Sequence, residues 1–154
     1  MKIHKILAIA ALFASITFVS PANAHDNGLI TKPSPYGVGE TLDRLEAIFA
    51  KKGITVFARV DHAAGAKKVG ADMKPTQLLI FGNPKMGTPL IMKNRVMGID
   101  LPLKVLAWED NNGKTMIAYN DPEFLAKRHG VTGHPVLAKM AGALKNLTGA
   151  ATKK

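Results

Sequence analysis

Asp61 and His62 are the adjacent residues of this sequence that are best suited to chemistry. An imidazole gains and loses a proton near neutral pH, so His62 could act as a general base or as a metal ligand. Asp61 could orient the ring, although neighbouring residues on a strand point to opposite faces and can pair only across a turn. The structural alternative is that Asp61 caps the following helix and that His62 donates a hydrogen bond.

A second candidate is the turn Gly82-Asn83-Pro84-Lys85, which directly follows an apolar run. A glycine-containing turn after a strand can direct backbone N–H groups and a lysine toward an anion. Its spacing differs from that of the phosphate-binding loop, so a chain reversal is the structural alternative. The candidate ligand-binding residues are Arg59, His62, Gly82, Asn83 and Lys85. The candidate catalytic residues are Asp61, His62 and Lys85.

Metal sites made of thiolates are excluded, because the sequence contains no cysteine. His129 and His134 lie five residues apart, which differs from the i, i+4 spacing of a helical metal pair. His25 becomes the amino-terminal residue if a leader is removed after Ala24, and its amine and ring nitrogen could then chelate Cu(II). His62 could join His129 and His134 only through the fold. We predict no cofactor and regard His25 as a candidate metal ligand.

Residues 1–24 have the pattern of a signal peptide. Lys2 and Lys5 precede an apolar stretch over 6–19, and Ala22-Asn23-Ala24 forms a cleavage site of small residues. The apolar stretch is shorter than the ~20 residues that a membrane-spanning helix needs. We therefore expect cleavage near Ala24 and a mature chain without a membrane span, located in the bacterial periplasm or secreted.

The composition restricts the partners that the chain can bind. Among 154 residues there are 21 Lys or Arg and 11 Asp or Glu, which gives a formal net charge of +10. This balance favours anionic partners, but the lysines are spread along the chain. With one Trp, two Tyr and six Phe, and no stripe of alternating basic and aromatic residues, we expect no nucleic acid binding. The absence of cysteine also excludes a disulfide framework and a cysteine nucleophile.

Helices and strands that alternate along the chain must position these residues. Apolar residues at spacings of three and four predict amphipathic helices, as at Val38, Leu42, Leu45 and Phe49. Alternating or continuous apolar runs predict strands. The predicted helices are 38–52, 61–70, 86–95, 121–129 and 135–147. The predicted strands are 54–60, 77–81, 103–109 and 114–119, with a short strand near 29–32.

The order of these elements predicts the fold class. Asn112-Gly113 is typical of a hairpin turn and joins the last two strands, so at least part of the sheet is antiparallel. We predict an α+β fold with one four- to five-stranded mixed or antiparallel sheet and helices packed on one side. After the signal peptide we expect an N-terminal leader at 25–37, a single domain at 38–148 and a flexible basic tail at 149–154.

Three ordered blocks of the sequence resemble a known family. They are Arg59-Val60-Asp61-His62-Ala63-Ala64, the run from Pro75 to Pro84, and the run from Asp100 to Val105. Together with the segment Thr41-Leu42-Asp43-Arg44-Leu45, they are similar to the domain of unknown function 302. The resemblance extends roughly over residues 29–130. It implies a small α+β domain and implies no activity.

Three alternative functions follow from these observations. The first is a periplasmic binding or accessory domain that holds a small ligand or protein partner in a cleft near Asp61, His62 and the 82–85 turn. Such a domain would also self-associate as a homodimer through an exposed sheet edge or apolar face. The second is a hydrolase or lyase with His62 as the base, Asp61 as its orienter and Lys85 as an electrostatic clamp. The third is a copper or zinc carrier that uses His25 or His62.

Overall fold

A computed structural model describes residues 27–154, so the signal peptide, the cleavage site near Ala24 and His25 lie outside the described residues. Strands and helices follow one another along the chain as the sequence patterns predict. In chain order the elements are β1 (Leu29–Ser34), α1 (Val38–Lys51), β2 (Thr55–Asp61), α2 (His62–Lys68), β3 (Thr76–Gly82), α3 (Pro84–Lys93), the 3₁₀ helix η1 (Arg95–Ile99), β4 (Leu103–Glu109), β5 (Thr115–Asn120), α4 (Pro122–Arg128) and α5 (Pro135–Ala151).

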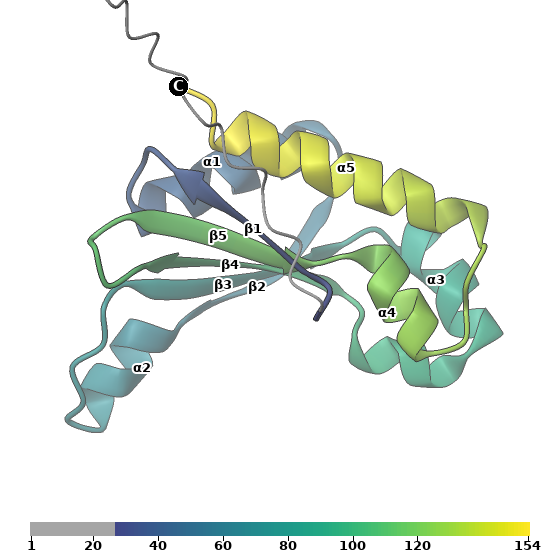
Figure 1. The fold of residues 1–154 in the computed structure, drawn as a ribbon, viewed down its shortest axis with the longest axis horizontal. Helices are drawn as coiled ribbons and strands as arrows, with labels where there is room; N and C mark the ends of the chain where they lie inside the picture. The colour runs from purple at the N-terminus through teal and green to yellow at the C-terminus, as the bar shows by residue number, and fades with distance from the viewer. Residues whose placement is uncertain (1–26) are drawn as a thin grey trace, which may run out of the picture.

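The five strands form one sheet in the order β1-β5-β4-β3-β2. Every neighbouring pair is antiparallel, and Gly113 takes the positive φ of 75° that the predicted hairpin between β4 and β5 requires. Helices α1 and α5 lie over one face of the sheet (Figure 1). Helices α3 and α4 gather at one end of the sheet, while α2 projects at the other end. The predicted α+β class is confirmed, with five strands and an antiparallel sheet.

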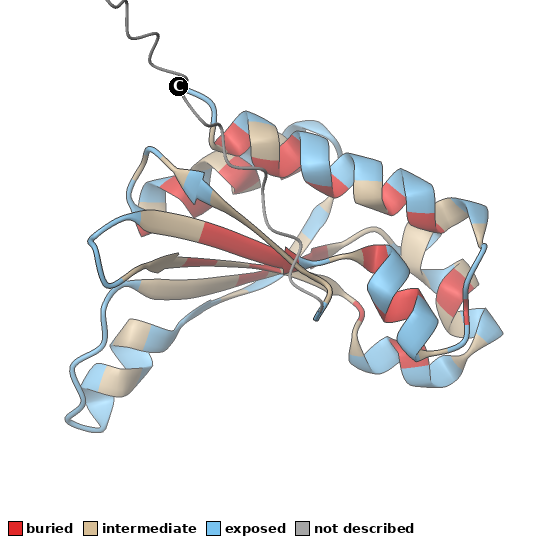
Figure 2. Cartoon of the chain, viewed as in Figure 1, coloured by how far each residue is buried: buried red, intermediate tan, exposed pale blue. Residues whose placement is uncertain are grey.

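The main core lies between one face of the sheet and helices α1 and α5. Leu42, Leu45 and Phe49 share one face of α1 because they repeat at spacings of three and four, and none is more than 1% exposed. Alternate residues of β3, Leu79 and Phe81, meet them from the sheet. The rings of Phe49 and Phe81 pack with their centroids 4.3 Å apart. This buried layer runs through the interior of the molecule in Figure 2.

A smaller core lies at the end of the molecule where α3, η1 and α4 meet the start of α5. Leu90, Met97, Leu125 and Leu137 are buried together there, one from each of these elements. Leu103, at the start of β4, packs against both cores. The two cores therefore meet near the end of the sheet that carries Leu103.

The opposite face of the sheet is apolar and is not covered by α1 or α5 (Figure 1). The strand register places Leu78 opposite Leu106, and Trp108 opposite Met116, on this face. All four side chains are partly exposed. Within residues 27–154, no helix combines the length and the apolar character needed to cross a membrane.

The structure differs from the predicted boundaries at both ends of the domain. Strand β1 pairs with β5, so the sheet begins inside the segment that we expected to be a leader. Helix α5 continues past residue 147 to Ala151, which is 1% exposed and whose carbonyl accepts a hydrogen bond from Nε of Arg44 at 2.9 Å. The hydroxyl of Tyr36 donates to the carbonyl of Lys153 at 2.9 Å. The predicted flexible tail is therefore packed in part, because these contacts hold it against the start of the domain.

Candidate ligand-binding cavity

The pair Asp61 and His62 begins a helix. Asp61 is the N-cap of α2, and its Oδ1 accepts a hydrogen bond from the backbone N–H of Ala64 at 2.8 Å. Its Oδ2 accepts a second hydrogen bond from Nε2 of Gln77 at 3.0 Å. His62 is exposed in the first turn of α2. Both carboxylate oxygens are thus occupied by other groups, and the structural alternative for Asp61 is the one observed.

Arg59 belongs to a network that joins α1 to the sheet. Its Nε and Nη2 donate to Oε1 of Gln77 at 3.0 and 2.7 Å, and Nη2 also donates to the carbonyl of Gly39 at 3.0 Å. Its Nη1 pairs with the carboxylate of Asp43, on α1, at 2.5 Å. These contacts use every nitrogen of the guanidinium. Arg59 therefore links β2 to β3 and to α1. The prediction that Arg59 binds a ligand gains no support.

The two candidate regions lie at opposite ends of one strand pair. Strands β2 and β3 are antiparallel, with Asp61 opposite Gln77 and Thr55 opposite Gly82. Because a strand rises about 3.3 Å per residue, Asp61 and the 82–85 turn are about 20 Å apart. The expected single cleft near Asp61, His62 and this turn is therefore wrong. The physical reason is that β3 runs antiparallel to β2, so the C-terminal ends of these two strands lie at opposite ends of the strand pair.

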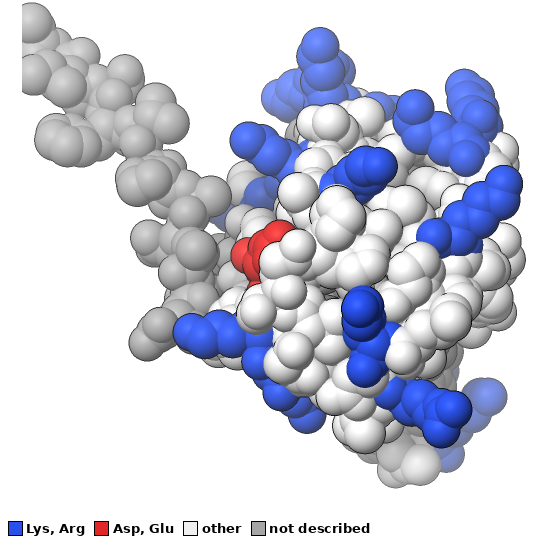
Figure 3. Space-filling view, turned by 90° about the vertical axis from the view of Figure 1, so that its right-hand side faces the viewer, with Lys and Arg blue, Asp and Glu red and all other residues white. Residues whose placement is uncertain are grey.

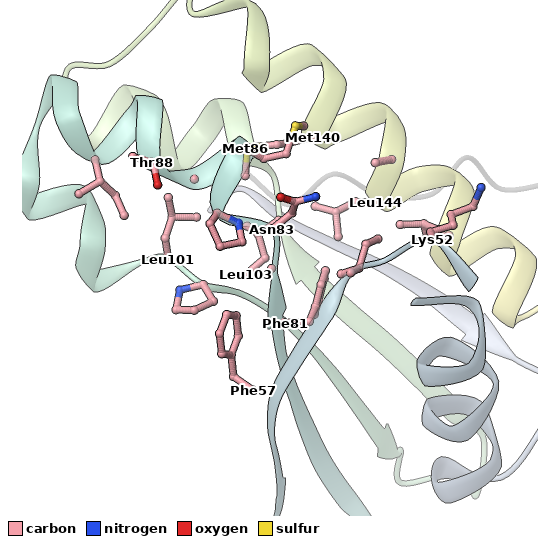
Figure 4. A pocket seen from close by; sticks show the side chains of 18 of the residues that line it. Lys52, Phe57, Phe81, Asn83, Met86, Thr88, Leu101, Leu103, Met140 and Leu144 are labelled. Carbon is pink, nitrogen blue, oxygen red and sulfur yellow. The ribbon is translucent and has the colours of Figure 1, made fainter. Parts of the chain in front are cut away.

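A cavity of about 580 Å³ lies beside the Gly82 turn, where the sheet, α3 and α5 meet. Phe81 and Leu103 line it from the sheet, Met86 from α3, and Met140 and Leu144 from α5 (Figure 4). These residues come from both cores, so the cavity occupies the place where the two cores meet. Its volume is typical of sites that hold small molecules.

Two glycines keep large side chains out of the cavity wall. A Cβ on Gly82 would lie 3.4 Å from Cβ of Pro102 and 3.5 Å from Cε2 of Phe57, so a side chain larger than that of alanine would meet both rings at the end of β3. A Cβ on Gly87, in α3, would meet Cδ1 of Leu101 at 3.7 Å, which is an ordinary contact. A larger residue at position 87 would therefore extend into the space that the cavity now occupies.

Phe57 is an exposed aromatic ring in the lining of the cavity. The pairing of β2 with β3 shifts between Val56 and Ala58, which marks a β-bulge at Phe57. A bulge breaks the regular alternation of side chains and can redirect one of them. Phe57 is 53% exposed although it lines the cavity. The ring can therefore cover an apolar molecule that enters from solvent.

Polar groups are few in the lining. Asn83 is the N-cap of α3, and its Oδ1 accepts a hydrogen bond from the backbone N–H of Lys85 at 2.9 Å. Its amide lies among the lining side chains with the nitrogen toward Leu144 (Figure 4), so Nδ2 can donate to a ligand. Lys52 and Thr88 stand at opposite margins of the same view. Among the described residues, no acidic side chain lines the cavity, so it suits neutral or anionic apolar molecules.

The predicted ligand-binding residues are thus divided. Gly82 and Asn83 line the cavity. Lys85 is exposed and contributes its backbone N–H to the cap of α3. Arg59 and His62 are not among the residues that line the cavity, and His62 follows the end of β2 that is opposite to the cavity. The structure therefore places two of the five predicted ligand-binding residues in the cavity lining and leaves the candidate catalytic pair, Asp61 and His62, outside it.

Sequence reasoning missed most of the cavity lining. Met140 and Leu144 lie in the predicted helix 135–147, and the apolar stripe of a helix does not reveal where packing leaves a gap. Phe57 lies in the predicted strand 54–60, and a bulge there depends on pairing with another strand. The available signal was Gly87, a small residue inside a short helix that is otherwise rich in large apolar side chains.

Among the described residues, the other two histidines make structural contacts. Nε2 of His129 lies 2.5 Å from Oδ2 of Asp100, with side chains 6% and 15% exposed, and Nη1 of Arg128 lies 3.4 Å from the other oxygen of that carboxylate. Nδ1 of His134 accepts a hydrogen bond from the backbone N–H of Val136 at 3.2 Å and so caps α5. Within the part of the chain that the structure describes, no three His, Cys, Asp or Glu residues are grouped as metal ligands.

Titratable groups with shifted pKa values lie outside the cavity lining. Burial lowers the pKa of Lys32 and of Lys104, and burial raises the pKa of Tyr119. In the turn between β4 and β5, a hydrogen bond from the backbone N–H of Lys114 is the main cause that lowers the pKa of Asp110. None of these four groups lines the cavity, so the cavity would bind a ligand mainly through apolar contacts.

Comparison with known proteins identifies relatives of this chain. The family model described as domain of unknown function DUF302 matches residues 30–147, which confirms the resemblance seen in the sequence. Over 110 residues the chain is 48% identical to proteins named Fluoride-specific ion channel FluC 1 from Brucella suis biovar 1 (strain 1330) and Brucella abortus biovar 1 (strain 9-941). These matches cover 71% of this chain but 43% and 41% of the two relatives.

A solved structure is also similar to this chain. It is an uncharacterized conserved protein DUF302 from Bacillus stearothermophilus, which has a TM-score of 0.66 and 24% sequence identity. The similarity covers 81% of this chain and 95% of that chain. The antiparallel five-stranded fold is therefore shared between the two proteins.

Proposed function

Since the chain belongs to the DUF302 family, whose description specifies no activity, we propose from its cavity that it is a binding domain for a small apolar ligand. The single observation that carries this proposal is the apolar cavity of about 580 Å³ between the sheet, α3 and α5. The cavity opens to solvent past exposed side chains such as Phe57 and Ala143. A concave, mostly apolar hollow of this volume with a few polar groups is the usual form of a site that binds a small molecule.

The lining indicates the chemistry of the ligand. Aromatic and aliphatic side chains such as Phe57, Phe81 and Leu144 would contact its apolar body. Nδ2 of Asn83 would donate a hydrogen bond to an acceptor on it and so fix its orientation. Because Lys52 is the charged side chain in this lining, a neutral or weakly anionic ligand is favoured over a cation.

The alternatives from the sequence fit the arrangement less well. A hydrolase or lyase would use His62 with Asp61 and Lys85, but Asp61 is engaged by Ala64 and Gln77, and Lys85 is at the far end of the strand pair. A copper or zinc carrier would rest on His25, which lies outside the described residues. The ligand-binding role is therefore the one that a specific observation favours.

We also propose that the domain acts in the periplasm as an accessory part of a larger system. The periplasmic location rests on the signal-peptide pattern over residues 1–24. The accessory role is consistent with the relatives named as fluoride-specific ion channels, in which the matched region is less than half of the chain. Self-association as a homodimer through the uncovered sheet face remains part of this proposal.

Binding of an uncharged fluorescent apolar probe, N-phenyl-1-naphthylamine, tests the cavity. Ala143 and Ala138 are both exposed on α5, and of the two Ala143 lines the cavity. We expect the probe to become fluorescent with the native chain. Ala143→Trp should weaken its binding at least about tenfold, which corresponds to about 1.4 kcal/mol, because the indole fills the cavity from α5.

Ala138→Trp is the matched control, with the same change on the same helix outside the lining. Equal weakening by the two variants, or unchanged binding by Ala143→Trp, would mean that the probe binds elsewhere. Absence of probe binding to a folded native chain would contradict the proposal itself.

A further inference from the structure

Three large apolar side chains project into solvent from one short segment at the end of the molecule. Met92, in the last turn of α3, is 79% exposed, and Val96 and Ile99 of η1 are 65% and 71% exposed. Residues three apart eclipse one another in a 3₁₀ helix, so Val96 and Ile99 share one face of η1. Met97, between them, is 1% exposed and anchors the segment in the smaller core. The exposed side chains therefore stand on a fixed support.

Basic side chains surround this apolar segment. Lys93 and Arg95, which lie between Met92 and Val96 in the sequence, are both exposed. The part of the chain that builds this end, residues 84–101 and 122–140, contains six Lys or Arg and two acidic residues. One of these acids, Asp100, is occupied by His129 and Arg128. Figure 3 views this end and shows Lys and Arg around an uncharged centre, with acidic atoms only at one margin.

Apolar side chains within a basic border match the surface of a membrane that carries anionic lipids. The apolar groups gain free energy by entering the boundary between headgroups and acyl chains, and Lys or Arg near the surface pair with anionic phosphates. A single-stranded nucleic acid would use aromatic side chains for stacking, and a duplex would pair with basic side chains alone; neither accounts for the exposed aliphatic side chains of Met92, Val96 and Ile99. The side chains also project outward rather than line a groove, which favours insertion into a soft surface over docking of a folded partner.

We propose that the surface formed by Met92, Lys93, Arg95, Val96 and Ile99 docks on a bilayer with anionic headgroups. The domain then lies on the membrane with α3 and η1 against the headgroups and α2 directed away from them. This proposal is independent of the ligand cavity, because it uses side chains outside the cavity lining. A domain that fails to bind an apolar probe could still dock on a membrane in this way. A domain that fails to dock could likewise still bind the probe.

Site-specific fluorescence tests the docking surface in the full chain. Because the sequence contains no cysteine, Val96→Cys and Ile99→Cys each give one position for an environment-sensitive nitrobenzoxadiazole label. Val69→Cys is the matched control, because Val69 is 82% exposed at the C-terminal end of α2. Vesicles of phosphatidylcholine mixed with phosphatidylglycerol should shift the emission of the label to the blue at positions 96 and 99, but not at 69.

The charged residues provide the second half of the test. Lys93→Gln combined with Arg95→Gln should weaken vesicle binding roughly thirtyfold, since each surface charge contributes about 1 kcal/mol. Lys67→Gln combined with Lys68→Gln, on α2, should leave it unchanged.

Three outcomes would overturn the docking proposal. One is an equal shift at position 69, which would mean that another part of the chain attaches to the vesicles. Another is the absence of any shift at positions 96 and 99. The third is an equal effect of the two charge variants. If the second outcome is accompanied by a shift at positions 96 and 99 when an acidic protein is added, the surface belongs to a protein partner instead.

Discussion

Filling the cavity from Gly87 should stabilise the protein and prevent ligand binding at the same time. Gly87 lies inside α3, and a Cβ there would make one ordinary contact, with Leu101 at 3.7 Å. Gly142 lies inside α5, where a Cβ would have no neighbour within 4 Å. Gly87→Leu and Gly142→Leu therefore make the same chemical change in two helices, once facing the cavity and once facing solvent.

The expected free energies differ by the burial of one side chain. Replacing a glycine inside a helix by a good helix former gains about 1 kcal/mol, and both variants share this term. Complete burial of a leucine side chain is worth about 1.5–3 kcal/mol, and only the variant at position 87 gains a part of it. We expect the free energy of unfolding to rise by about 2 kcal/mol for Gly87→Leu and by about 1 kcal/mol for Gly142→Leu.

Urea unfolding followed by circular dichroism measures these stabilities, and titration with N-phenyl-1-naphthylamine measures binding. The probe should bind Gly87→Leu at least about tenfold more weakly, while Gly142→Leu should bind it as the native chain does. Because leucine can overpack a cavity, Gly87→Ala provides a smaller step that should be stabilising in any case. A destabilised Gly87→Ala, or unchanged probe binding by a stabilised Gly87→Leu, would refute the reasoning that position 87 faces usable space.

Other predictions concern residues outside the cavity. Asp61→Ala should lower the free energy of unfolding by about 1 kcal/mol because it removes an N-cap, whereas His62→Ala should leave urea unfolding unchanged. A larger loss of stability from His62→Ala than from Asp61→Ala would instead assign a structural role to the imidazole. Asp100→Ala should cost about 1–3 kcal/mol because it leaves the buried ring of His129 without its partner, and Asp100→Asn should cost less, as thermal unfolding can show. The lowered pKa of Asp110 means that its carboxylate stabilises the hairpin above the unfolded pKa and loses this effect as pH falls through the folded pKa. The Asp110→Asn variant should therefore lose less stability than the native chain when the pH falls from neutral to below about 4. The same loss of stability in both chains would contradict this assignment.

Local sequence patterns predicted most of the fold because they reflect local physics. The spacing of Leu42, Leu45 and Phe49 reflects the turn of a helix against a core, and these residues are the buried face of α1. The Asn112-Gly113 turn reflects a backbone conformation that favours glycine, and it joins β4 and β5. The order of such elements was sufficient to predict one partly antiparallel sheet with helices on one side.

The site could be predicted only in part because it depends on contacts between distant segments. Asp61 and the Gly82 turn looked like neighbours while the direction of β3 was unknown, and the antiparallel register separates them. The cavity requires α5 to lie over α3 and the end of the sheet, so Met140 meets residues that are far from it in sequence. No periodicity within one helix contains that information.

Methionine methyl resonances provide the most direct test of the central proposal that the cavity binds an apolar ligand. Met86 and Met140 line the cavity from two helices, whereas Met92 is 79% exposed at the end of the molecule and Met116 lies on the uncovered face of the sheet. In a titration of ¹³C-methyl-methionine protein with N-phenyl-1-naphthylamine, we predict shifts at Met86 and Met140 together with nuclear Overhauser contacts to the probe. Shifts confined to Met92 or Met116, or no shift at a saturating probe concentration, would contradict the proposal.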